Sequence, residues 1–147
     1  MITNSDRSLA LLRKLVAEFN LTFEECAKLS GTTKCHISEQ FTGRAVQVNQ
    51  PLPYKIGAEL HRRHKIVYKN FKHFNIKTDL HKVMKFLIIG QVSLGRELNI
   101  SENDFKKLCA AKLILTNWDA KFRLYRIKFK RILKRRIDFI ENSFKNS

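Results

Sequence analysis

Cationic side chains are concentrated near the C-terminal end of the sequence, where residues 121–136 hold nine lysines and arginines and no acid. Fixed cations that recur at three- and four-residue steps along a helix form one stripe, which suits the phosphates of a nucleic acid backbone. The sequence therefore predicts phosphate contacts in this segment. The stripe consists of Arg123, Arg126, Lys130 and Lys134.

The same segment also contains aromatic residues, so an anionic membrane surface is an alternative partner. We prefer a simpler interpretation, in which the aromatics are core or dimer contacts and no membrane is bound. On this interpretation, the candidate dimer contact of the long C-terminal helix comprises Phe122, Tyr125, Phe129 and Ile132.

A second informative segment, residues 23–43, has the spacing of two short helices joined by a tight turn. Ala27 is small enough to let the helices approach closely, Gly31 can supply the positive φ of the turn, and Ile37 can anchor the second helix in the core. The second helix would then project from the body, where it could enter a DNA major groove.

Residues 21–44 resemble the helix-turn-helix of lambda repressor and Cro proteins. The resemblance rests on Ala27, Gly31, Ile37 and the nearby run Phe41-Thr42-Gly43. The sequence departs from that family at Ser30 and Gln40, where apolar residues are usual, and at Phe23, where Gln is frequent. In that family the start and outer face of the second helix read bases. The resemblance places this role on Thr33, Lys34, Cys35, Ser38 and Glu39.

The chemistry of these side chains suits base recognition. Lys34 can donate to guanine O6 and N7, whereas Glu39 can accept from cytosine N4. Thr33 and Ser38 can contact either a base or a phosphate. His36 and Gln40 are further candidates, depending on the roll of the helix, and Arg44 is a candidate phosphate contact.

Other chemistry is weakly represented. The sequence has no P-loop, no dinucleotide fingerprint and no HExxH pattern, and its acids are scattered, so we expect neither an enzyme nor a cofactor. Cys26, Cys35, His36 and Cys109 lack the paired spacing of zinc sites, and no metal is expected. We interpret Cys26 and Cys109 as small core residues. His61 and His64 lie one turn apart and could meet a metal or phosphate, although a solvated or stacked role is favoured.

Composition favours an all-α fold, because 44% of the 147 residues are hydrophobic and only 2 are Pro and 5 Gly. Apolar runs do not exceed four residues, and the polar start Met1–Arg7 does not resemble a secretory signal, so we expect a cytoplasmic protein. Helical periodicity and cap residues predict helices over residues 6–19, 22–30, 33–41, from Pro53 through Phe74, from Thr78 to Gly90 or Gly95, 101–113 and 118–142.

Charge divides the chain at the aperiodic segment 44–53. Residues 1–52 hold 6 basic and 5 acidic side chains, a net charge of +1, whereas residues 53–147 hold 23 and 8, a net charge of +15. We therefore predict a tri-helical helix-turn-helix unit at 1–48 and a basic all-helical domain at 53–147.

Together these features predict a DNA-binding transcription regulator of bacterial or phage type. Its expected partners are double-stranded DNA and a second copy or another protein. The alternative is an RNA-binding or nucleoprotein-assembly module in which the helix-turn-helix is only a scaffold.

Overall fold

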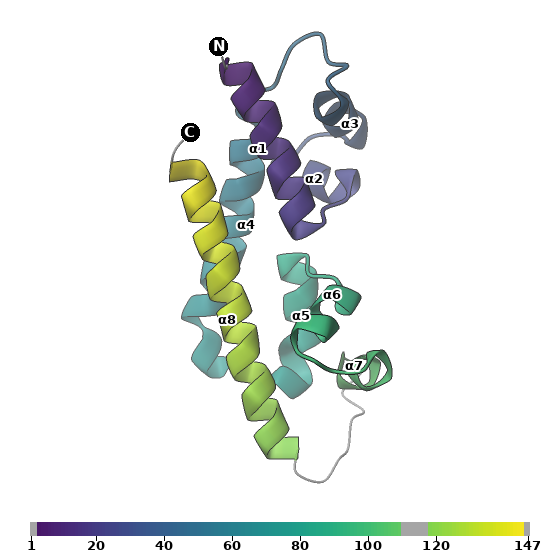
Figure 1. Cartoon of the computed structure of the whole chain (residues 1–147), viewed down its shortest axis with the longest axis vertical. Coiled ribbons are helices and arrows are strands. Elements are labelled where there is room, and N and C mark those ends of the chain that lie inside the picture. The colour runs from purple at the N-terminus through teal and green to yellow at the C-terminus, as the bar shows by residue number, and fades with distance from the viewer. Residues whose placement is uncertain (1–2, 110–117, 146–147) are drawn as a thin grey trace. The chain divides into compact units, whose positions relative to one another are not determined.

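The computed structural model describes residues 3–109 and 118–145, in which every regular element is helical (Figure 1). This confirms the all-α class. Contacts divide the chain into two compact units, which we call the terminal unit (Met1–Arg62 with Phe139–Ser147) and the central unit (Arg63–Asp138). The boundaries between the units, after Arg62 and after Asp138, both fall inside helices. They differ from the charge-based division at residues 48–53.

The terminal unit begins with three short helices whose ends are set by local chemistry. They are α1 (Asn4–Phe19), α2 (Phe23–Ser30) and α3 (Lys34–Thr42). The predicted capping box of Thr22 and Glu25 starts α2. Helix α1 starts two residues earlier than predicted, because Asp6 is the third residue of a capping box with Thr3 rather than the cap itself.

Helix α4 (Leu52–Lys69) has Pro53 in its first turn, as predicted. It ends before the expected Phe71 and Phe74, which belong to a 3-10 turn, η1 (Phe71–His73), and its C-terminal flank. Helix α5 (Ile76–Leu87) ends close to Gly90, the earlier of the two predicted stops, and a separate helix, α6 (Gln91–Glu97), follows it instead of the continuation to Gly95.

Helix α7 (Glu102–Cys109) starts at the predicted cap, because the Ser101 hydroxyl accepts a hydrogen bond of 3.2 Å from the Asp104 backbone N–H. Its expected extension to Leu113 lies outside the described residues. The long C-terminal helix predicted over residues 118–142 is present as α8 (Trp118–Lys145), which starts at the predicted residue and ends at Lys145.

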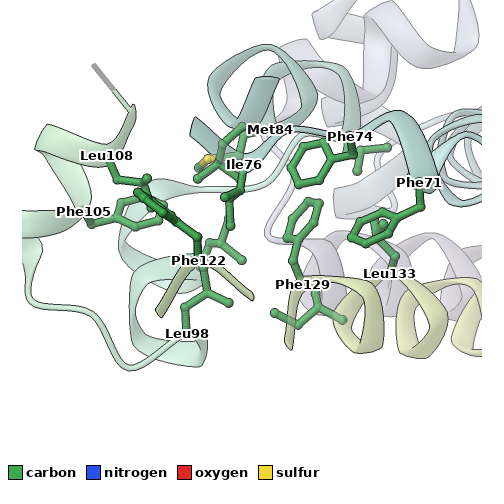
Figure 2. Packing of buried hydrophobic residues seen from close by; sticks show 14 residues of the cluster. Phe71, Phe74, Ile76, Met84, Leu98, Phe105, Leu108, Phe122, Phe129 and Leu133 are labelled. Carbon is green, nitrogen blue, oxygen red and sulfur yellow. The ribbon is translucent and has the colours of Figure 1, made fainter. Parts of the chain in front are cut away.

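The core of the central unit is built around three phenylalanine rings. Each ring contacts the other two: the Phe74 centroid is 5.2 Å from Phe71 and 5.3 Å from Phe129, the Phe71 and Phe129 centroids are 6.3 Å apart, and the planes are nearly parallel (Figure 2). Phe122, Ile132 and Leu133 of α8 belong to the same cluster. The Phe122–Ile132 stripe is therefore largely buried in the chain's own core, and its expected role as a dimer contact is wrong.

Candidate nucleic-acid interface

The turn between α2 and α3 has the conformation that the sequence requires. Gly31 has a φ of +73°, in the left-handed region that favours glycine, and the Thr32 N–H donates to the Ala27 carbonyl over 3.0 Å. The Thr33 hydroxyl then accepts from the His36 N–H at 3.1 Å and caps α3. Helices α2 and α3 consequently pack against each other with a very short connection (Figure 1).

The inner side of this pair is well buried. Ile37 is 0% exposed, Ala27 is 6% exposed and Cys26 is 0% exposed. Burial, followed by the charge of Glu25, raises the pKa of the Cys26 thiol from 9.0 to about 11. Cys26 is therefore a core residue, as predicted, whereas the side chain of Cys109 lies outside the described part of the chain.

The outer side of α3 brings the five predicted base-reading residues together. Thr33, Lys34, Cys35 and Glu39 are exposed, and Ser38 is partly exposed. Because side chains three and four residues apart share a helix face, residues 35, 38 and 39 lie next to one another. The Cys35 thiol is 3.5 Å from a Glu39 carboxylate oxygen, to which it can donate.

Gln40 lies on the inner side of α3 instead and is only 6% exposed. Its amide nitrogen donates to the Gln47 carbonyl at 2.9 Å, and its amide oxygen accepts from the Asn49 N–H at 2.8 Å. The His36 ring is 2.9 Å from the Asn49 amide. Both side chains hold the loop after α3, so Gln40 is not a base-reading candidate in this arrangement.

The other two departures from the lambda repressor pattern also have local explanations. The Ser30 hydroxyl donates to the Cys26 carbonyl at 2.7 Å, which leaves no unsatisfied hydroxyl at this half-buried position. The Phe23 ring packs against Phe41 with a centroid distance of 5.2 Å. The Phe23–Phe41 contact therefore joins α2 to α3, whereas Ser30 bonds within α2 and Gln40 holds the loop after α3.

The loop after α3 is fixed at both ends. The Arg44 and Ala45 N–H groups donate to the Glu39 carbonyl, and the Ser8 hydroxyl of α1 donates to the Gln50 carbonyl at 2.9 Å. Arg44 is exposed, as a phosphate contact must be. The loop also presents Val46, which is fully exposed and which sequence reasoning missed. Its only signal in the sequence was an apolar residue in a polar connection.

The four cations of the predicted stripe on α8 differ in whether their charged groups contact other parts of the chain. The Arg126 guanidinium donates to the Phe71 carbonyl at 2.7 Å and to the Phe74 carbonyl at 3.4 Å, and it lies over the Phe71 ring. Lys134 is paired with Asp138 at 3.0 Å. Arg126 therefore ties α8 to η1. Arg123 and Lys130 are exposed, although the Lys130 ammonium also lies 5.6 Å from the Tyr68 ring centroid and 5.7 Å from that of Phe71.

Net charge separates the two units about as clearly as it separates residues 1–52 from residues 53–147. The terminal unit has 9 basic and 7 acidic residues, a net charge of +2, whereas the central unit has 20 and 6, a net charge of +14. Arg131, on the exposed part of α8, adds a cation that was not in the predicted stripe.

His61 and His64, the pair one turn apart, both lie against other parts of the chain, and His64 is not solvated. The His61 ring is 2.9 Å from a Glu141 oxygen, and His64 is 0% exposed. Within residues 3–109 and 118–145, no three His, Cys, Asp or Glu side chains are grouped as metal ligands would be. None of the helices in the described ranges combines the length and apolar character that crossing a membrane requires.

Comparison with known proteins identifies no relative: no family model matches the chain, and no curated protein or solved structure matches it either.

Proposed function

We propose that this chain is a sequence-specific DNA-binding transcription regulator of bacterial or phage type, in which α3 reads bases in the major groove. The observation that carries the proposal is the two-sided character of α3. Buried Ile37 fixes one side, while five polar or ionisable residues occupy its capped start and opposite face. A major groove admits an α-helix in this orientation, with its N-terminal residues against the base edges.

The exposed residues have complementary roles in this proposal. Lys34 donates to guanine O6 and N7, and Glu39 accepts from cytosine N4. Thr33, Cys35 and Ser38 complete the contact surface, and Val46 of the following loop can meet a thymine methyl group. Arg44 contacts a phosphate beside the bases that α3 reads.

The central unit supplies most of the electrostatic attraction to DNA. Its net charge of +14 favours a polyanion as partner. Exposed cations of α8, among them Arg123 and Lys130, are the proposed phosphate contacts. Lys134 shares its charge with Asp138, so we expect a smaller contribution from it.

Selection of duplexes from a random DNA pool, followed by salt titration, tests this proposal. We expect the selected site to be bound about 10³-fold or more tightly than unrelated DNA at the same salt concentration. Equal affinity for all duplexes with a steep salt dependence would contradict base reading. Tighter binding of the corresponding RNA would instead support the RNA-binding alternative.

The symmetry of the selected sites tests the proposed homodimer. A two-fold dimer should select near-palindromic half-sites about one helical turn apart, or a multiple of it. Single, asymmetric sites would indicate a monomer or a different partner protein.

A further inference from the structure

The central unit contains an open apolar groove with a volume of about 400 Å³. It is lined by the end of α4, the turn η1 and the helix α5. Its walls include Ile66 and Val67 of α4 and Val83 and Phe86 of α5. Ile66 is 40% exposed although it is a large apolar side chain. The base-reading surface of α3 belongs to the other unit, so this groove is a separate feature.

The polar side chains at the groove fall into two groups. Asn70 donates to the Ile66 carbonyl at 2.9 Å, and Asp79 accepts from the Asn75 N–H at 2.9 Å. These two side chains are therefore engaged at the end of α4 and the start of α5. His73 and Lys82 are exposed at the same groove. A ligand consequently meets apolar walls with a rim that carries the exposed Lys82 ammonium and, at the start of α5, the Asp79 carboxylate.

We propose that this groove binds an acidic amphipathic helix of a partner protein. A groove between two helices is a common receptor for the apolar face of a third helix. Charge complementarity selects an acidic one, because the central unit has a net charge of +14. The same charge opposes a second copy of this chain at the groove, and the apolar walls offer nothing to a phosphate backbone.

Fluorescence polarisation of the full chain with two labelled peptides tests the proposal. One peptide has Leu at positions i, i+3, i+4 and i+7 of a helix and Asp or Glu on its other face. The second has the same composition with the leucines scrambled, so that only the apolar face is lost. We expect the patterned peptide to bind at least about tenfold more tightly than the scrambled peptide at physiological salt.

Substitutions at exposed positions locate the binding surface without disturbing the core. Ile66→Asp should weaken binding of the patterned peptide about tenfold or more. Val92→Asp, at an exposed valine of α6 outside the groove, should change it less than about twofold. Lys82→Glu should weaken binding severalfold, and Lys107→Glu on α7 is its charge-matched control. Thermal unfolding verifies that all four variants are folded.

Three outcomes would overturn the proposal. Equal binding of the two peptides would indicate general electrostatic attraction, and equal effects of Ile66→Asp and Val92→Asp would place the contact elsewhere. Concentration-dependent self-association that Ile66→Asp abolishes would identify a second copy as the occupant. None of these results depends on whether α3 reads DNA.

Discussion

Two neighbouring side chains of α3, Glu39 and Gln40, face in opposite directions and have different tasks. Glu39 is exposed beside Cys35, whereas Gln40 is buried and makes both of its amide hydrogen bonds to the loop at residues 47–49. The sequence favoured an outward Glu39 but left the orientation of Gln40 open. A buried glutamine is rare unless it is hydrogen-bonded, and its partners are seven and nine residues away in an aperiodic segment.

Lys34 provides the most direct test of base reading. We expect Lys34→Ala to lose about 1–3 kcal/mol of discrimination at one base pair, because a lysine donates to guanine O6 and N7. Binding to the selected site and to single-base variants of it measures this loss. Arg44→Ala removes a proposed phosphate contact and should weaken binding to every duplex by a similar factor. Unchanged base preference in Lys34→Ala would remove Lys34 from the set of base-reading residues.

Cys26 makes stability depend on pH in the alkaline range. Its folded-state pKa is raised to about 11, so below about pH 9 the thiol is protonated in both states and its contribution to stability is complete. As the pH rises toward 11, the unfolded chain loses this proton more readily than the folded one. The free energy of unfolding should therefore fall over that range.

Urea unfolding at about pH 8 and about pH 10 measures the alkaline loss of stability. Cys26→Ala should reduce the difference between the two pH values, whereas Cys35→Ala, which removes an exposed thiol, should leave it nearly unchanged. An equal pH dependence in the Cys26→Ala variant would contradict the assignment.

At the scale of elements, local signals predicted both ends of α1, α2 and α3 to within two residues. The caps Thr22 and Ser101 could be recognised, and the cap of α3 could be narrowed to Thr32 or Thr33, because a cap bonds to a backbone group three residues away. The turn η1 and the separate helix α6 could not be predicted. The position of η1 depends on Phe71 and Phe74 packing against Phe129, more than fifty residues later.

Gly31 tests the conformation of the α2–α3 turn. We expect Gly31→Ala to destabilise the fold by about 1–2 kcal/mol, because a Cβ disfavours the left-handed region although no atom lies within 4 Å of its position. Gly90→Ala is a matched control, since Gly90 also has an open surrounding but a φ of −72°. It should cost only a few tenths of a kcal/mol. Thermal or urea unfolding of both variants makes the comparison, and equal losses would indicate that backbone strain is not the cause.

Arg126 and Arg123 allow structural and nucleic-acid-binding cations of α8 to be distinguished. Arg126→Ala should lower the free energy of unfolding by about 1.5–3 kcal/mol, because the Phe71 and Phe74 carbonyls lose a charged donor. Arg123→Ala should leave stability within about 0.5 kcal/mol but reduce the salt slope of DNA binding by about 1. Urea unfolding and salt titration of both variants measure these effects. If Arg126→Ala changed the salt slope of DNA binding more than Arg123→Ala, Arg126 would be a phosphate contact as first predicted.

At the scale of the whole molecule, the terminal unit is assembled from both ends of the chain. The Phe139 ring meets Phe19 edge to face with a centroid distance of 5.6 Å, and Phe144 lies 5.3 Å from Tyr54. Charge and composition could not predict this arrangement. Periodicity shows which residues of a helix are apolar, but not which distant helix covers them.

Removal of residues 139–147 should consequently affect the helices of the terminal unit more than those of the central unit. We expect faster amide hydrogen exchange in α1 and in residues 52–62 of α4, because Phe19 and its neighbours lose buried contacts. Phe105→Ala, within the central core, should have the opposite effect and accelerate exchange mainly in α6 and α7. Uniform acceleration in both variants would show that the two units unfold as one.

The discontinuous terminal unit also determines the order in which the protein can be completed during synthesis. Its first 62 residues leave the ribosome before the central unit, but Phe139 and Ile140 emerge only after a further 76 residues have been made. At about 5–20 residues per second, the nascent α1–α3 segment waits about 4–15 s for its last packing partners. During this interval Phe19 and Tyr54 lack the rings that cover them in the finished protein. The nascent residues 1–62 are therefore accessible to chaperones, proteases and aggregation until residues 139–147 have been added.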